Sequence, residues 1–175
     1  MMRAQARIIL LRATARNRYC WPMTDQPDPV AAWRAVLLAQ SRAMRAIERD
    51  LASAGHISLT WYDVLLELNA APERRLRMQE LGLKAVVSRT RVSRIVTELE
   101  LAGFVERVPD ADDGRATLAT ITPVGRAALR EAAPVYLAGI EHHFTRYLTT
   151  SQQRMIAAGL QRVIDAHDAE TDPRR

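Results

Sequence analysis

The sequence of 175 residues is poor in the residue types on which several classes of protein depend. It has a single cysteine, Cys20, which excludes an internal disulfide framework and a zinc site built from several cysteines. Aromatic residues make up 5% of the chain, too few for the stacked side chains that bind single-stranded nucleic acid. No apolar run approaches the ~20 residues that a membrane-spanning helix needs. We therefore expect a cytoplasmic protein without membrane contact.

The motifs of catalytic and metal sites are also missing. The chain has no glycine-rich phosphate loop, no Gly-x-Ser-x-Gly turn and no plausible cysteine–histidine pair. It has no Glu-x-x-His or His-x-x-x-His spacing, and the adjacent His142 and His143 point in different directions on a helix. We therefore expect no enzymatic activity, no metal site and no cofactor.

Most of the net positive charge lies at the N-terminus. The formal charge is +5, and residues 1–20 contain five arginines and no acidic residue. Taking these five from the 25 basic residues leaves 20 basic and 20 acidic residues over residues 21–175. Because the rest of the chain is neutral overall, an interaction with nucleic acid must depend on a local basic patch.

Residues 1–29 are expected to form a basic, disordered extension. Prolines between positions 22 and 29 make its end non-helical. The segment lacks the apolar stretch of a secretory signal. An upstream extension ending before Met23, a basic arm on DNA phosphates and an organelle transit peptide stay open. Cys20 lies outside every predicted element, so we expect no redox role for it.

Helical periodicity dominates the remaining chain. Apolar residues at spacings of three, four and seven predict an amphipathic helix over residues 30–51. Thr60 and Asp63 resemble a capping box, which predicts the start of a second helix that ends before Pro72. A short apolar stretch predicts a third, brief helix over residues 76–83. The fold is therefore expected to be mainly α.

A fourth helix and two β-prone runs follow. Ser88 is a suitable cap for a helix over residues 89–101. Residues 104–108 and 117–121 flank an Asp-Gly turn pair, so they predict a two-stranded hairpin. Helix, short helix, helix and hairpin in this order form a winged helix-turn-helix, which we assign to residues 60–122.

The C-terminal part is predicted to be helical again. Thr122 followed by Pro123 predicts the start of a long helix. Pro134 lies inside this helix and is expected to kink it or split it near Arg130. Ser151 is predicted to open the last helix.

The fourth predicted helix has two contrasting faces. Its apolar stripe is formed by Val92, Ile95, Val96 and Leu99. Its polar face and flanks carry Arg89, Thr90, Arg91, Ser93, Arg94 and Thr97. Residues 73–94 hold seven basic and two acidic residues, a local charge of +5. Arginines and short hydrogen-bonding side chains near a helix N-terminus suit contact with a DNA groove, which predicts binding to double-stranded DNA.

Several motifs in this region resemble the MarR-type winged-helix transcription regulators. They are LRMQELGL over residues 76–83, VSRTRVSRIVTELE over 87–100, GFVER over 103–107, DGR over 113–115 and TITPVG over 120–125. With the flanking helices, the resemblance covers residues 30–168. One departure is Gly82, where the family usually has alanine. Glycine costs ~1 kcal/mol inside a helix, so we expect the third helix to end early.

The resemblance implies a homodimer on a pseudo-palindromic operator, with half-sites about one helical turn apart. Residues 30–59 and 123–170 would supply the interlocking dimerisation helices, whose apolar stripes exceed what one winged helix covers. The residues expected to contact DNA are Ser88, Arg89, Thr90, Arg91, Ser93, Arg94, Thr97, Asp113 and Arg115. Within the family, the wing arginine enters the minor groove and the aspartate orients it, roles that fall to Arg115 and Asp113. The arginines of the helix would mostly contact phosphates, while Thr90 and Ser93 would help to choose the sequence.

The resemblance also implies a repressor that a small phenolic or anionic ligand releases. Trp33, Tyr62 and Asp63 are the candidate ligand-binding residues, through a stacking surface, a hydroxyl and a carboxylate. The alternative is that Trp33 belongs to the core and Asp63 only completes the cap at Thr60. Two other functions stay open, a winged-helix protein-interaction module and a non-specific architectural DNA binder. The basic helix and wing arginine argue against the first, and the neutral body argues against the second.

Overall fold

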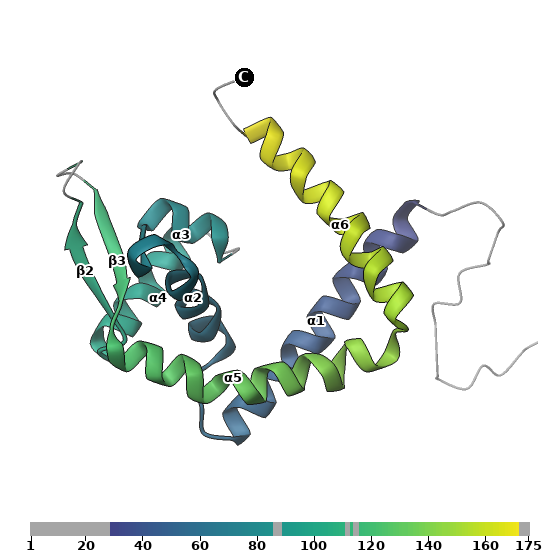
Figure 1. The fold of residues 1–175 in the computed structure, drawn as a ribbon, viewed down its shortest axis with the longest axis horizontal. Helices are drawn as coiled ribbons and strands as arrows, with labels where there is room; N and C mark the ends of the chain where they lie inside the picture. The colour runs from purple at the N-terminus through teal and green to yellow at the C-terminus, as the bar shows by residue number, and fades with distance from the viewer. Residues whose placement is uncertain (1–28, 86–88, 111–112, 114–115, 172–175) are drawn as a thin grey trace, which may run out of the picture.

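The computed structural model describes residues 29–85, 89–110, 113 and 116–171 (Figure 1). Helices dominate this part of the chain, and one three-stranded antiparallel sheet accompanies them, so the predicted mainly α fold with a small wing is confirmed. Residues 1–28 of the expected N-terminal extension, including Cys20, lie outside the described residues, as do the predicted cap Ser88 and the wing residue Arg115; Pro29 is the first residue of a helix. For Arg89 and Thr90 the structure describes the backbone only.

The first helix, α1 (Pro29–Ser53), is buried only near its C-terminal end. There Ile47 and Leu51 are buried in the core, whereas Val30 and Trp33 at the other end are exposed. Gly55, which has a φ of 72°, follows the helix in the left-handed region that glycine tolerates best. In Figure 1, α1 crosses the long helix α5 (Pro123–His143), with which it is in contact.

The second helix, α2 (Leu59–Ala70), begins earlier than the predicted capping box. Ser58 is its N-cap, and the Ser58 Oγ accepts a hydrogen bond from the Trp61 amide at 3.2 Å. The Leu59 amide donates to Glu48 on α1 at 2.8 Å. Because this contact from α1 holds the first helical amide, the helix starts at Leu59 and the predicted cap at Thr60 is wrong.

The start of the predicted third helix is instead a strand. Residues Arg75–Arg77 form β1, and the helix α3 (Met78–Lys84) begins only after it. The strand forms because it pairs with β3 (Thr117–Ile121), with Arg75 opposite Thr120. Gly82 is buried inside α3, which continues past it, so the expected early end is wrong.

The predicted hairpin is confirmed as part of this larger sheet. Its strands are β2 (Val105–Pro109) and β3, which pair antiparallel with Val105 opposite Ile121 and Pro109 opposite Thr117. The strand order is β1-β3-β2. Helix α4 (Arg89–Leu101) precedes the hairpin, and Gly103, which has a φ of 74°, follows its end.

Helix α5 is continuous through its internal proline, so the alternative that Pro134 splits it is wrong. Thr122 caps the helix as predicted, because its Oγ1 accepts from the Gly125 amide at 3.0 Å. Pro134 is exposed, so water can satisfy the Arg130 carbonyl that loses its intrahelical partner. A short 3-10 turn (Thr145–Tyr147) then leads to α6 (Thr150–Thr171).

The last helix begins slightly before the predicted Ser151. Thr149 and Gln152 form a capping box, because the Gln152 Oε1 accepts from the Thr149 amide at 2.8 Å. The Thr149 Oγ1 accepts in turn from the Gln152 amide at 3.3 Å.

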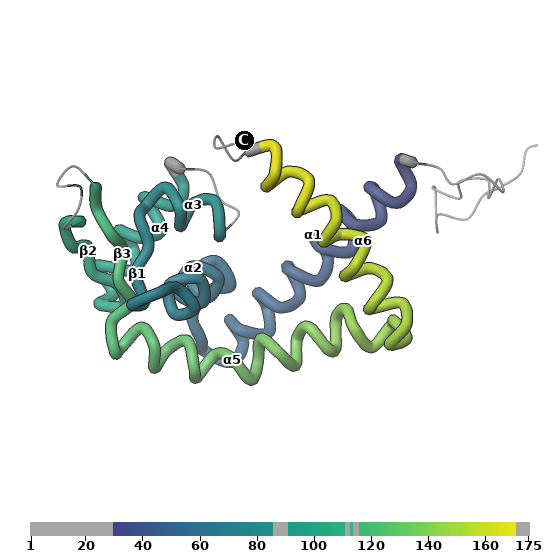
Figure 2. Tube along the Cα trace, turned by 45° about the horizontal axis from the view of Figure 1, so that its top comes forward, coloured from purple at the N-terminus to yellow at the C-terminus, as the bar shows by residue number. Residues whose placement is uncertain are grey.

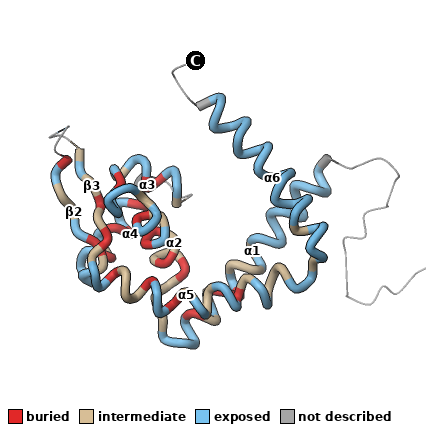
Figure 3. Tube along the Cα trace, in the orientation of Figure 1, coloured by how far each residue is buried: buried red, intermediate tan, exposed pale blue. Residues whose placement is uncertain are grey.

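The hydrophobic core lies in the lobe formed by α2, α3, α4 and the sheet, with the end of α1 and parts of α5 packed against it. Figure 3 shows the buried residues gathered in this lobe, and α6 exposed along its length. Figure 2 shows α6 extending from the end of α5 that is remote from the lobe. No helix of the described chain has both the length and the apolar content to cross a membrane.

Candidate nucleic-acid interface

Helix α4 presents the two faces predicted from its sequence. The stripe of Val92, Ile95, Val96 and Leu99 is buried, with at most 4% of any of these residues exposed. The opposite face is exposed, and its residues with described side chains are Ser93, Arg94 and Thr97, with the exposed Arg91 on its flank. Burial of the stripe against the lobe fixes which face of α4 is directed outward. This exposed polar face is the candidate interface.

Arg94 is strongly exposed on this face and has an ion-pair partner on the same helix. Its side chain is 83% exposed, and its Nε donates to Glu98 Oε1 at 3.0 Å. Glu98 also accepts from the Trp61 indole at 3.4 Å. Exposed ion pairs one helical turn apart contribute little free energy, so Arg94 can exchange Glu98 for a phosphate at small cost.

Thr97 and Ser93 are joined to a residue that sequence reasoning missed. The Thr97 hydroxyl donates to the Ser93 carbonyl at 3.0 Å and accepts from Arg107 on β2 at 2.9 Å. The side chain of Arg107 is only 27% exposed. Arg107 appears in the sequence only as the last residue of the GFVER motif, and no local pattern indicates its contacts, because its partners on α4 lie 7 to 14 positions earlier in the chain.

The base of the wing contains a buried carboxylate that was also missed. Asp110 is 7% exposed, and its Oδ2 accepts from the Nε of Arg77 at 2.6 Å. This hydrogen bond, together with the charge of Asp110, raises the pKa of Arg77. Asp110 also closes the wing, because its amide donates to the Ala116 carbonyl at 3.1 Å. The carbonyl of Asp113 accepts from the Ala116 amide at 2.8 Å.

The candidate ligand-binding residues do not meet within one chain. Tyr62 is buried and stacks on Tyr136, with ring centroids 4.3 Å apart, and Asp63 is half-buried beside it. Trp33 is 63% exposed and lies three turns, or ~16 Å, before Met44, where α1 first packs on the core. The two alternative roles are wrong, because Trp33 is exposed in the single chain and Ser58 rather than Thr60 caps α2; the ligand-binding role stays a prediction.

Asp63 has an unusual protonation equilibrium. Burial raises its pKa to about 6, with further contributions from the negative charges of Glu67 and Glu48. The same burial raises the pKa of Tyr62. A carboxyl group that is easier to protonate in the folded state stabilises the protein at low pH, and this stabilisation is lost as the pH rises through about 6.

Replacing Asp63 with asparagine is therefore expected to stabilise the protein at pH 7.5, by about 1 kcal/mol because solvent screens a half-exposed group. The gain should shrink as the pH falls from about 6 toward the unfolded-state value of ~4. Urea unfolding of both proteins between pH 4 and 8 measures it. A difference that is constant across this range would contradict the assignment.

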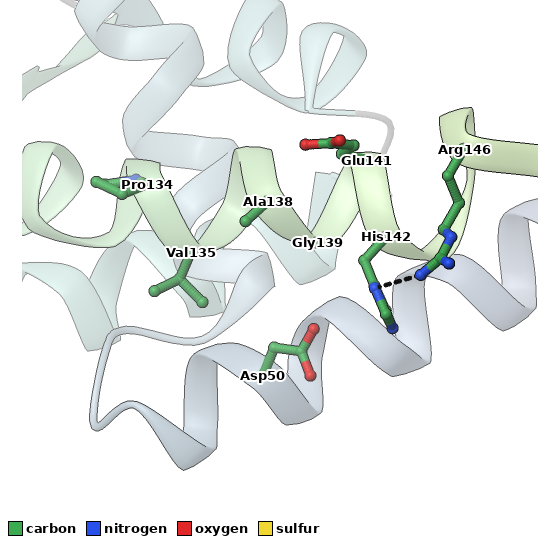
Figure 4. A pocket seen from close by; sticks show the side chains of 8 residues that line it. All are labelled: Asp50, Pro134, Val135, Ala138, Gly139, Glu141, His142 and Arg146. Carbon is green, nitrogen blue, oxygen red and sulfur yellow. Dashed lines mark hydrogen bonds between the residues drawn. The ribbon is translucent and has the colours of Figure 1, made fainter.

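A separate hollow of about 680 Å³ lies where α5 crosses α1 (Figure 4). Its walls are Asp50, Pro134, Val135, Ala138, Gly139, Glu141, His142 and Arg146. The Nη1 of Arg146 lies 2.9 Å from the Nδ1 of His142, as Figure 4 shows. The neighbouring His143 pairs with Asp50 across the two helices at 2.7 Å. Among the described residues no three metal-ligating side chains come together.

Comparison with known proteins shows which proteins this chain resembles in sequence and fold. Residues 56–116 match the family model described as MarR family. An uncharacterized HTH-type transcriptional regulator of Bacillus cereus is 32% identical over 95 residues, which cover 54% of this chain and 61% of that protein. This match therefore spans less than two thirds of the relative's length.

Two solved structures from Streptomyces coelicolor cover more of the chain. AbsC, a MarR family transcriptional regulator, is 25% identical with a TM-score of 0.72, over 83% of this chain and 99% of AbsC. Sco3205, a MarR family transcriptional regulator solved in complex with DNA, is 28% identical with a TM-score of 0.71. That alignment covers 82% of this chain and 92% of Sco3205. The family match at the winged helix and these similarities along most of the fold agree, so this chain is similar to MarR family regulators in both sequence and fold.

Proposed function

We propose that the protein binds double-stranded DNA sequence-specifically and regulates transcription, with α4 in the major groove and the wing in the adjacent minor groove. The observation that carries this proposal is the polar, exposed face of α4 beside the β2–β3 hairpin. The similar Sco3205 was solved in complex with DNA, which supports the same use of the fold. Because a regulator of this kind works at the chromosome, we also propose a cytoplasmic location.

The roles of individual residues follow from side-chain chemistry. Arg91 and Arg94 are suited to phosphates, which attract guanidinium groups irrespective of sequence. Ser93 is suited to a base edge, because its hydroxyl both donates and accepts. Ser88, Arg89, Thr90 and Arg115 keep the roles predicted from the sequence, with Asp113 orienting Arg115.

Replacing Arg94 with alanine is expected to weaken binding ~10-fold on every DNA sequence. It should also reduce the slope of the logarithm of the binding constant against the logarithm of the salt concentration by about one. The reason is that a phosphate contact carries no base information. Fluorescence anisotropy on a set of duplexes with single base-pair changes measures both effects. Arg130→Ala, which removes an exposed arginine from α5, is the charge-matched control. A loss confined to one base pair would instead make Arg94 a base reader.

We propose further that the functional unit is a homodimer. Helices α1 and α6 leave apolar side chains uncovered within one chain. Trp33 is 63% exposed and Met155 is 64% exposed. The other exposed apolar residues on these helices are Val30, Val36, Leu37, Leu38, Ile156, Leu160, Val163 and Ile164. Contiguous apolar surfaces of this kind mark association sites, and a second copy would cover them and place two α4 helices on one duplex.

A binding selection from a random duplex library tests this function. The full chain is expected to enrich a pseudo-palindrome with half-sites ~10 base pairs apart, one helical turn. Enrichment of no motif despite steeply salt-sensitive binding would favour a non-specific architectural protein. Failure of a folded dimer to retain any duplex would favour a protein-interaction module.

We also propose that the regulator represses and that a small ligand releases it from DNA. Tyr62, Tyr136 and Asp63 lie together where α2 meets α5. The tyrosine rings are suited to stacking on a phenolic ligand. The nearby Glu48 and Glu67 disfavour an anion at this position, so a neutral phenol is the better candidate. Release of a labelled duplex by phenols but not by benzoates would support this ligand class, and the reverse would contradict it.

A further inference from the structure

Arg107 on β2 contacts helix α4 at three positions along its length. Its Nη2 donates to the Ser93 carbonyl at 3.2 Å and to the Thr97 hydroxyl at 2.9 Å. Its Nη1 lies 2.5 Å from Glu100 Oε2. Residues 93 and 100 are ~10 Å apart along the helix axis. One guanidinium group therefore spans two turns of α4.

These contacts restrict how the hairpin can move relative to α4. Arg107 lies in the middle of β2, opposite Ala119 of β3. Contacts that hold its side chain therefore also restrict the position of both strands of the hairpin. A guanidinium group is planar and presents its donors in a fixed fork. Simultaneous bonds to a carbonyl, a hydroxyl and a carboxylate therefore define the direction of β2 as well as its distance from α4.

We propose that Arg107 is a positioning residue, which sets the wing at the angle that lets α4 and Arg115 enter adjacent grooves of one duplex. This inference rests on the proposed DNA-binding function. The inference also gives Thr97 a role as an acceptor for Arg107 rather than as a reader of bases. We call the contacts of Arg107 with Ser93, Thr97 and Glu100 the clamp. Thr97 and Ser93 are thereby separated in role, because only the carbonyl of Ser93 takes part in the clamp and its hydroxyl stays available for DNA.

The alternative role for Arg107 is a direct phosphate contact. Three observations disfavour it. The side chain is largely buried, with 27% exposed. Both terminal nitrogens already donate to α4. The charge of Arg107 is also offset by Glu100, whereas Arg94 on the outer face is 83% exposed.

A double-mutant cycle between Arg107 and Arg115 tests the positioning role, with the full chain and the duplex obtained by selection. Arg107→Ala is expected to weaken binding ~10-fold in the native background, which corresponds to the minor-groove contact that is lost. In the Arg115→Ala background the same substitution should weaken binding less than ~2-fold, because no wing contact is left to misplace. Arg130→Ala is the charge-matched control and should leave affinity unchanged in both backgrounds.

Two conservative variants separate positioning from direct contact. Arg107→Lys keeps the charge but loses the fork, so it should bind as weakly as Arg107→Ala. Thr97→Val removes one acceptor and keeps the charge and shape. It should weaken binding equally for all base pairs under α4, and this loss should also disappear in the Arg115→Ala background. Thermal unfolding of each variant confirms that it is folded.

The outcomes distinguish this inference from the proposed function. Native affinity of Arg107→Lys would overturn the positioning role in favour of a phosphate contact. So would an unreduced loss of affinity when Arg107→Ala is made in the Arg115→Ala background. Native affinity of folded Arg107→Ala would overturn it while leaving the proposed function intact. Absence of sequence preference in the unsubstituted protein would overturn the proposed function and the inference with it.

Discussion

Substituting Leu160→Glu together with Ile164→Glu on α6 is expected to convert a dimer into a monomer and to weaken DNA binding at least ~100-fold. Both residues are exposed within one chain and lie one turn apart on the apolar face of α6. A carboxylate at either position would have to be buried without a partner in a dimer. A monomer could hold only one half-site, which removes most of the affinity of the pair.

Sedimentation velocity and anisotropy on the selected duplex measure these two effects. The matched control is Ala158→Glu with Ala169→Glu, which adds the same charge to exposed positions on the opposite face of α6. This control should remain dimeric and bind normally. A dimer that survives the substitutions at Leu160 and Ile164 would show that α6 is not part of the interface.

Replacing Asp110 with alanine is expected to reduce the specific affinity for DNA as strongly as Arg115→Ala, ~10-fold or more, and to lower the free energy of unfolding by about 2 kcal/mol. Asp110 is buried at the base of the wing, where Arg77 donates to it at 2.6 Å. Its removal takes a buried charged acceptor from the segment that carries Arg115. The pairing of β1 with β3 stays, but the side-chain contact from Arg77 to the segment after β2 is lost, so the contact of the wing with the minor groove should weaken.

Urea unfolding and anisotropy measure the two parts of this result. Glu106→Ala is the control, because Glu106 is a carboxylate on the same hairpin whose side chain is exposed. Its effect on stability should be below ~0.5 kcal/mol. A stability loss without any change in DNA affinity would show that Asp110 holds the lobe together but does not place the wing.

The parts of the fold that depend on local pattern could be predicted from the sequence. The two faces of α4 follow from the period of its apolar residues, and the hairpin follows from β-prone runs around a turn. Elements that depend on distant partners could not be predicted. The strand β1 exists because Arg75–Arg77 pair with Leu118–Thr120. Ser58 rather than Thr60 caps α2 because Glu48 on α1 holds the following amide.

The same distinction applies to the candidate site. The exposed positions of Arg91, Ser93 and Arg94 were predictable, since Ser93 and Arg94 lie on the face opposite the apolar stripe and Arg91 lies on its flank. The ion pair of Arg77 with Asp110 spans 33 positions in the sequence, and no local signal indicates it. Arg107 was visible only as part of a family motif, and its role depends on acceptors that the fold brings to it.

The most direct measurement of the central claim is an anisotropy titration of the full chain against a labelled duplex from upstream of its own gene, with a scrambled duplex as competitor. Two salt concentrations are needed, because affinity for DNA without a stated salt concentration is uninterpretable. We predict a preference of ~100-fold or more that persists at the higher salt and is lost in Arg115→Ala. Equal, steeply salt-dependent affinity for both duplexes, unchanged by Arg115→Ala, would contradict sequence-specific recognition by α4 and the wing.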